Sequence, residues 1–139
     1  MNALEMNKNG YLLLFHSHEW WQQLGREELQ KYIAQNNAWL EKLMATGQAK
    51  GGQALALTGA IISGKNGRTI TDGPFAESKE VIGGYLLLDV ATFAEAVAIA
   101  KTAPMIALGT SIEVRPLTDV CPSGARLKEL MQAAQLATA

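Results

Sequence analysis

Gly10-Tyr11-Leu12-Leu13-Leu14-Phe15 recurs later in the chain as Gly84-Tyr85-Leu86-Leu87-Leu88-Asp89. Each stretch is a short apolar run that begins at a glycine, and such runs are typical of buried strands. Neither run alternates between apolar and polar residues, so neither predicted strand has a face suited to water. The sequence therefore predicts two similar strands that are covered on both faces.

A helical pattern follows each of these runs. After the first run, residues 26–45 carry apolar side chains at helical spacing, and Gly47 is placed to end the helix. After the second run, Thr92 and Glu95 have the spacing of a capping box. Pro104 lies beyond the end of this second helix, because proline cannot continue the hydrogen-bond ladder. Each apolar run therefore begins a strand–helix unit.

The residues between the two units carry strand and turn signals. We predict a strand over residues 54–57 and a hairpin of strands 60–63 and 68–71 around Gly64-Lys65-Asn66-Gly67. After the second helix, residues 111–115 alternate between polar and apolar side chains. This alternation predicts a final, half-exposed strand.

The chain ends in a predicted helix that begins near Ser123. One face of this helix carries Leu127, Leu130, Met131 and Ala134. The helix has few charges, so we expect it to pack on the domain or on a partner chain. This divides the chain into a domain over residues 1–117 and a helical tail over residues 118–139.

The predicted order of elements is that of a ferredoxin-like α+β sandwich, βαββαβ, with an inserted β-hairpin and a C-terminal helix. In this topology the two Tyr-Leu-Leu-Leu strands form the central pair, and helices cover one face of the sheet. The same sheet of a second subunit can cover the other face, which predicts a homodimer. The alternative is that the tail helix covers that face within one chain.

Composition excludes several classes of protein. With 139 residues, 48% hydrophobic and 18% charged, the chain can form one folded domain. A formal net charge of -1 provides no overall attraction to nucleic acid or to an anionic membrane. Cys121 is the only cysteine, so no internal disulfide can form. The N-terminus lacks a basic start followed by an apolar run, so we expect a cytoplasmic protein without a membrane segment.

Asp72, Glu77 and Lys79 are candidates for chemistry. Asp72 precedes Gly73-Pro74, and this pattern is first of all a turn signal. The alternative is that the three charged side chains gather at one end of the sheet, where a carboxylate beside a lysine can act as a general base. Glu77 and Lys79 share one side of an extended chain, which also suits a simple ion pair.

His16 and His18 follow the first predicted strand and share one side of an extended chain. Two imidazoles can begin a metal site, but a catalytic zinc usually has three protein ligands, so we expect no cofactor. His16 is a second candidate for acid–base chemistry if it faces a cleft between subunits. The alternative is that both histidines lie at the surface.

The segment Thr71-Asp72-Gly73-Pro74-Phe75-Ala76-Glu77-Ser78-Lys79-Glu80, followed by Gly83-Gly84-Tyr85, resembles the signature of the YCII-related family. It is most similar to the branch named after the Asp-Gly-Pro-Phe motif, as is Ile112-Glu113-Val114-Arg115-Pro116. The resemblance covers the chain from about Gly10 to Leu117. It implies a ferredoxin-like fold paired into a dimeric α+β barrel. The wider family includes an enzyme that acts on a chlorinated hydroxyquinol and is thought to use a histidine in acid–base chemistry.

In the wider family this histidine lies in the first helix, and counting back from Gly47 leads to Asn36. The acidic residue that the family suggests before the proline corresponds to Ala103. An amide cannot transfer a proton near neutral pH, so both differences weaken the histidine-based mechanism for this chain.

Asn36 shares a helix face with two aromatic residues, so we expect this face to contribute to a ligand pocket. The expected pocket residues are Asn36, Trp39, Tyr32, Phe75, Glu77 and Lys79. Trp20, Trp21 and Trp39 either line an aromatic pocket or pack in the core or at an interface.

Two classes of function follow. The first is a small cofactor-independent enzyme that acts on a compact organic substrate, with Asp72 or His16 transferring the proton. The second is a dimer that binds a small ligand or a partner without catalysis, having lost the family histidine. Asn36 and Ala103 favour the second. In both classes the expected partners are a second copy and a small molecule, not nucleic acid or a membrane.

Overall fold

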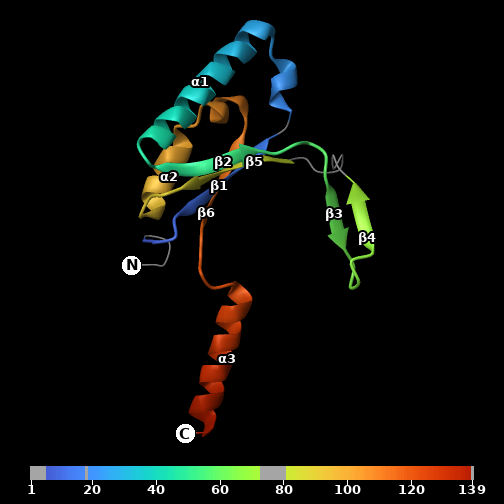
Figure 1. Cartoon of the computed structure of the whole chain (residues 1–139), viewed down its shortest axis with the longest axis vertical. Helices are drawn as coiled ribbons and strands as arrows, with labels where there is room; N and C mark the ends of the chain where they lie inside the picture. The colour runs from blue at the N-terminus through green and yellow to red at the C-terminus, as the bar shows by residue number, and fades with distance from the viewer. Residues whose placement is uncertain (1–5, 18, 73–80, 139) are drawn as a thin grey trace.

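The computed structural model describes residues 6–17, 19–72 and 81–138 (Figure 1). The elements of this part of the chain are β1 (Tyr11–Ser17), α1 (Arg26–Ala45), β2 (Ala49–Ala54), β3 (Ala60–Ser63), β4 (Thr69–Asp72), β5 (Val81–Leu88), α2 (Phe93–Lys101), β6 (Ser111–Pro116) and α3 (Pro122–Thr138). Two short 3-10 helices, η1 (Trp20–Gln23) and η2 (Pro104–Leu108), precede α1 and follow α2.

The main sheet has four antiparallel strands in the order β2-β5-β1-β6. Because β1 and β5 are central, the two Tyr-Leu-Leu-Leu strands pair with each other, as the sequence predicted. Their register places Tyr11 opposite Leu88 and Leu13 opposite Leu86. With α1 after β1 and α2 after β5, this is the ferredoxin-like α+β fold.

Helices α1 and α2 lie on one side of this sheet, and its core is formed there (Figure 1). Tyr11, Leu13, Leu86 and Leu88 point to this side and are buried. The residues between them, Leu12, Leu14, Tyr85 and Leu87, point to the opposite side and are half-buried. We call this opposite side the open face. Each central strand therefore presents apolar side chains to both sides, as the absence of alternation predicted.

The ends of α1 and α2 follow the predicted signals. The Thr92 side chain accepts a hydrogen bond of 3.1 Å from the backbone N–H of Glu95, which caps α2. Gly47 adopts a φ of +77° after the end of α1, a conformation that glycine reaches without strain. Pro104 begins η2 rather than a simple loop, because its fixed φ suits the first turn of a new helix.

The predicted strand over residues 54–57 is wrong in its bounds. The observed strand β2 ends at Ala54 and pairs with β5 through Gly51 and Gly52, residues that strand propensity disfavours. The apolar segment Leu55–Leu57 continues beyond the strand and is exposed. Apolar character alone therefore misplaced the strand, because the glycines are used for close strand pairing instead of for a turn.

The hairpin is confirmed as a separate two-stranded sheet of β3 and β4. Gly64 and Gly67, at φ of +86° and +68°, make its turn, and Gly67 N–H donates a hydrogen bond of 3.1 Å to Gly64 O. At the other end of the chain, the side chains of residues 121–137 in and before α3 are exposed. Among the described residues, no helix has the length and apolar character needed to span a membrane.

Candidate functional site

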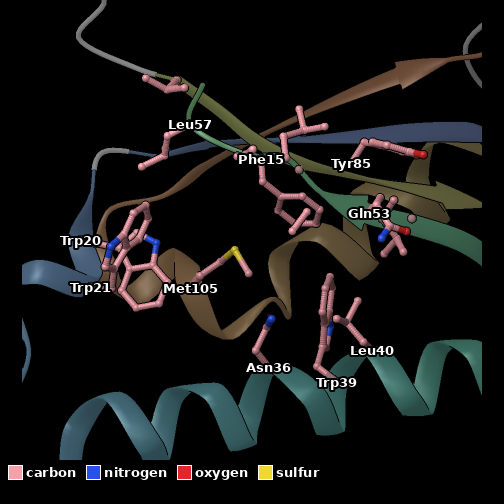
Figure 2. A pocket seen from close by; sticks show the side chains of 18 of the residues that line it. Phe15, Trp20, Trp21, Asn36, Trp39, Leu40, Gln53, Leu57, Tyr85 and Met105 are labelled. Atoms are coloured by element: carbon pink, nitrogen blue, oxygen red, sulfur yellow. The ribbon is translucent and has the colours of Figure 1, made fainter. Parts of the chain in front are cut away.

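A cavity of about 1140 Å³ lies between α1 and the helix-covered side of the sheet (Figure 2). Its lining comes from β1, η1, α1, β2, β5, η2 and the segment after β2. All three tryptophans of the chain contribute to it. The other large apolar residues that line it are Phe15, Leu40, Met44, Leu55, Leu57, Leu86 and Met105.

The aromatic side chains of the cavity are fixed by contacts with one another. The rings of Trp20 and Trp21 are 5.6 Å apart and nearly perpendicular, and those of Phe15 and Trp39 are 6.3 Å apart in an edge-on arrangement. Such edge-to-face pairs are favourable and restrict ring motion. Tyr32 is 6.3 Å from the Trp20 ring and supports it, while the cavity itself is lined by Asn36 and Trp39 of the predicted set.

Trp39 is also held by α2. Its Nε1–H donates a hydrogen bond of 2.8 Å to Thr102 Oγ1, and the Thr102 hydroxyl donates in turn to the carbonyl of Ile99 at 2.6 Å. Thr102 is the residue that ends α2. The indole therefore has a fixed orientation between the cavity and the end of α2, which is the condition for an aromatic side chain to act as a rigid binding surface.

Asn36 places a polar group in this apolar lining. Its side chain extends from α1 toward the cavity (Figure 2). The Oδ1 atom is buried and has no hydrogen-bond partner in the described part of the chain. A buried amide oxygen without a partner costs about 1–3 kcal/mol. A ligand that donates a hydrogen bond would remove this cost.

Glycines shape the sheet side of the cavity. Gly51, Gly52, Gly83 and Gly84 contribute to its lining from two paired strands. A Cβ at Gly52 would overlap the carbonyl oxygen of Tyr85, and one at Gly84 would lie 3.0 Å from the carbonyl oxygen of Gln53. These residues therefore leave space above the sheet and also let β2 and β5 approach closely.

The cavity carries little charge. Glu19, which is exposed, is the one charged residue among the described residues that line it. The described chain also has no group of three His, Cys, Asp or Glu side chains arranged to hold a metal ion. The site therefore favours an uncharged, mostly apolar molecule with a polar edge toward Asn36.

His16, the candidate for proton transfer, lies outside this cavity. It follows Phe15 on β1, and its side chain is on the open face, where Nε2 contacts Glu113 Oε1 at 2.9 Å. Glu113 Oε2 accepts a second hydrogen bond of 2.8 Å from Arg115. The Arg115 and His16 hydrogen bonds hold the pKa of Glu113 below its usual value. The structure does not bring His16 together with Asn36 and Trp39.

The other predicted residues are placed only in part. Asp72 is the last residue of β4 and pairs with Ala60, so its backbone belongs to the hairpin and not to the main sheet. His18, Phe75, Glu77 and Lys79 lie outside the described residues. The proposed cluster of Asp72, Glu77 and Lys79 therefore stays a prediction.

Residues 10–120 match the family model of the YCII-related domain. This match covers both strand–helix units, the hairpin and all of the residues that line the cavity. A search of curated proteins gives no match.

Proposed function

The chain belongs to the YCII-related family, and we propose that it binds a compact, uncharged aromatic molecule in the cavity beneath α1. The observation that carries this proposal is the buried, unpartnered Oδ1 of Asn36 in a lining of aromatic side chains. The aromatic rings supply apolar contact, and the amide supplies the directional contact. Small-molecule sites commonly combine these two components.

Exposed apolar side chains at the cavity support the same conclusion. Met44, Leu55 and Leu57 line it and are 48%, 44% and 37% exposed. Apolar side chains that remain accessible around a concave site mark a binding surface. The volume of about 1140 Å³ is slightly above the roughly 300–1000 Å³ typical of such pockets. A fused two-ring molecule fits easily.

The side chains that line this cavity favour ligand binding over proton transfer. Asn36 occupies the position that the family resemblance gives to a histidine, and an amide does not titrate near neutral pH. Its NH₂ group donates and its oxygen accepts, so it can orient a hydroxyl or carbonyl on a ligand. Acid–base catalysis by His16 or Asp72 stays a separate prediction, and for His16 it concerns the open face.

The experiment compares 2-naphthol with naphthalene, which differ by one hydroxyl group. We expect the wild type to bind 2-naphthol about fivefold more tightly in equilibrium dialysis, because one hydrogen bond contributes about 1 kcal/mol and the buried Asn36 Oδ1 has no partner in the described part of the chain. Asn36→Leu, which keeps the side-chain size, should bind the two compounds equally. If the wild type binds neither compound, or if the variant keeps the preference for 2-naphthol, the proposal is wrong.

We further propose that the open face forms a homodimer. Leu12, Leu14, Tyr85 and Leu87 form an apolar centre on that face, and Glu113 and Arg115 lie on β6 at its edge. An apolar centre with a polar rim is the usual anatomy of a protein interface. Sedimentation velocity at micromolar concentration should give a dimer, and Leu12→Glu should give a monomer. A monomeric wild type would contradict this proposal.

A further inference from the structure

We infer that two projecting elements, the β3–β4 hairpin and α3, clasp the second copy of the chain that covers the open face. We call these elements the arms. The inference rests on the proposed dimer and is independent of the proposed ligand. It is carried by the exposure of both arms, by their position relative to the sheet and by the area that a stable interface requires.

The first arm, α3, is a helix with an unused apolar stripe. Leu127, Leu130 and Met131 lie on one face and are 58%, 49% and 59% exposed. The helix has 17 residues, and helices in proteins gain most of their stability from packing an apolar face rather than from propensity alone. An apolar face of this kind favours a packing partner, and in the described part of the chain Leu127, Leu130 and Met131 stay exposed.

The second arm, the β3–β4 hairpin, has the same property. Ile62 and Ile70 are paired across its two strands on one side and are 67% and 63% exposed. A two-stranded hairpin alone is marginally stable, and it requires a further strand or a packing surface. The cross-strand isoleucine pair is thus an exposed apolar surface among the residues that the structure describes.

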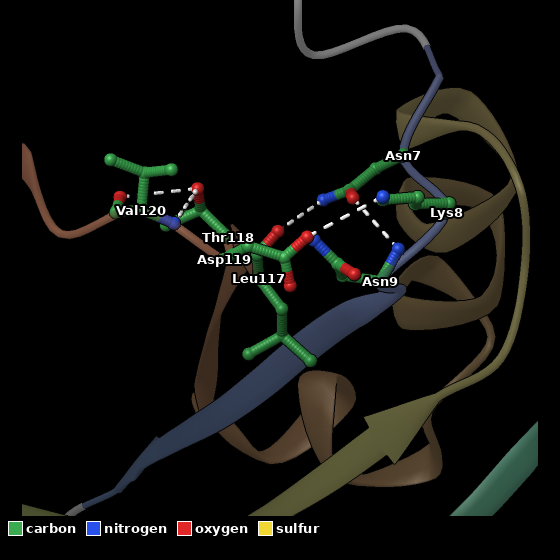
Figure 3. A network of polar contacts seen from close by, with 7 residues as sticks. All are labelled: Asn7, Lys8, Asn9, Leu117, Thr118, Asp119 and Val120. Atoms are coloured by element: carbon green, nitrogen blue, oxygen red, sulfur yellow. Dashed lines mark hydrogen bonds and ion pairs between the residues drawn. The ribbon is translucent and has the colours of Figure 1, made fainter. Parts of the chain in front are cut away.

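Both arms extend to the open side of the sheet. In Figure 1, α1 and α2 lie on one side of the sheet, whereas α3 and the hairpin extend away from these helices. The segment that joins β6 to α3 is held by residues that precede β1 (Figure 3). Asn7 Nδ2 donates a hydrogen bond of 2.6 Å to the Leu117 carbonyl, and Lys8 Nζ lies 3.5 Å from Asp119 Oδ2. Leu117 N–H also donates to the carbonyl of Gly10 at 3.0 Å. The direction in which the chain leaves β6 is therefore fixed by β1 and the residues before it.

The area that a stable interface requires favours a contribution from the arms. Four strands about 4.8 Å apart and about 20 Å long give the open face a footprint of roughly 400 Å². A stable interface buries about 800 Å² on each partner. A footprint of this size favours further contacts outside the sheet. The helix α3, at about 1.5 Å per residue, adds a second contact surface about 25 Å long.

A second copy fits this surface better than an unrelated protein because the need is reciprocal. Each copy has an open apolar sheet face to be covered and two arms to be packed, so one two-fold axis satisfies all of these surfaces in both copies at once. A partner that covered only one of them would leave the remaining apolar side chains in water.

The test uses full-length variants with matched controls on the opposite side of each arm. Leu130→Glu and Gln132→Glu add the same charge to the stripe and to the far side of α3. Ile70→Lys and Thr71→Lys do the same for the two sides of the hairpin, because neighbouring strand residues point in opposite directions. Sedimentation velocity over a concentration series gives the dimer dissociation constant of each. We expect Leu130→Glu and Ile70→Lys to raise it at least tenfold and the two controls to leave it unchanged.

A photo-crosslink provides a readout that does not depend on stability. With p-benzoylphenylalanine in place of Leu130, irradiation should give a covalent dimer, and the same residue in place of Gln132 should not. If Leu130→Glu and Ile70→Lys remain as dimeric as the wild type while Leu12→Glu dissociates, the arms do not clasp the partner although the sheet-face dimer exists. If the wild type is a monomer, both the dimer and the clasp are wrong. Neither result bears on ligand binding, because no ligand is present.

Discussion

The indole of Trp39 and the hydroxyl of Thr102 connect α1 to the end of α2 through a hydrogen bond of 2.8 Å. The same hydroxyl donates to the Ile99 carbonyl, so one threonine both terminates a helix and holds an aromatic side chain of the cavity. Thr46 ends α1 in a similar way, donating to the Leu43 carbonyl at 3.2 Å, but it holds no tryptophan. The two threonines therefore form a natural comparison.

Thr102→Val should weaken the binding of 2-naphthol about fivefold, because Trp39 loses a hydrogen bond that contributes about 1 kcal/mol to its orientation. Thr46→Val loses a comparable hydroxyl–carbonyl contact and should keep the wild-type affinity. Equilibrium dialysis of both variants, with thermal unfolding as the control for folding, tests this. Equal affinities in the two variants would show that the Trp39–Thr102 contact does not support the site.

Gly52→Ala should lower the free energy of unfolding by about 1–3 kcal/mol, because the added Cβ overlaps the Tyr85 carbonyl and β2 must move away from β5. Gly51→Ala meets no heavy atom within 4 Å. It should leave stability unchanged or raise it by up to about 1 kcal/mol, since alanine restricts the unfolded chain. Urea unfolding of the two variants measures the difference, and similar values would contradict the close approach of the two strands.

Asn36→Asp should introduce a carboxyl group whose pKa is raised by the apolar cavity. A group with a raised folded pKa stabilises the fold below its unfolded pKa, and this stability is lost as the pH rises through the folded pKa. The variant should therefore be less stable than the wild type at pH 7, and the deficit should shrink toward pH 4. Asn37→Asp, at an exposed neighbouring position, is the control and should show no such pH-dependent deficit.

Glu113 should have the opposite pH dependence. Its pKa is lowered below 4.5, first by the Arg115 hydrogen bond and then by His16. A lowered folded pKa contributes stability above the unfolded value, which is lost as the pH falls through the folded pKa. Glu113→Gln should therefore lose less stability than the wild type when the pH is lowered below about 4.5 in urea unfolding experiments. Arg115→Gln should lie between the two, and a variant curve parallel to the wild type would exclude this role.

The order of strands and helices could be predicted because its signals are local. Apolar runs, the Thr92 cap and the Gly64–Gly67 turn each depend on a few neighbouring residues. The direction of the central side chains could not be predicted in this way. The two copies of the Tyr-Leu-Leu-Leu run face opposite ways: Tyr11 is buried beneath the helices, whereas Tyr85 lies on the open face. A change of one residue in strand register moves every side chain to the other face of the sheet. In a run that is apolar at every position, the sequence pattern does not indicate which register is used.

The cavity shows the same limit. Asn36 and Trp39 were predicted as pocket residues, and both line the cavity. The prediction was possible because residues three positions apart on a helix lie on the same face. For Trp20 and Trp21 the sequence favoured packing over a pocket, since both uses require the same apolar ring and packing is the more common, whereas both side chains line the cavity. Gly52 and Leu57 gave no signal, because their contribution depends on strand pairing across a long stretch of chain. His16 was a candidate on the condition that it faces a cleft between subunits; strand alternation places it on the open face, and its role there stays a prediction.

Because every tryptophan of the chain lines the same cavity, the intrinsic emission of the protein originates from that one region. Excitation at the red edge of the absorption band, which avoids tyrosine, would therefore report a bound molecule without any label. The unfolding of α3 carries no tryptophan with it and should leave this emission almost unchanged. The molecule thus contains its own optical probe for occupancy, separated in sequence from the helical tail.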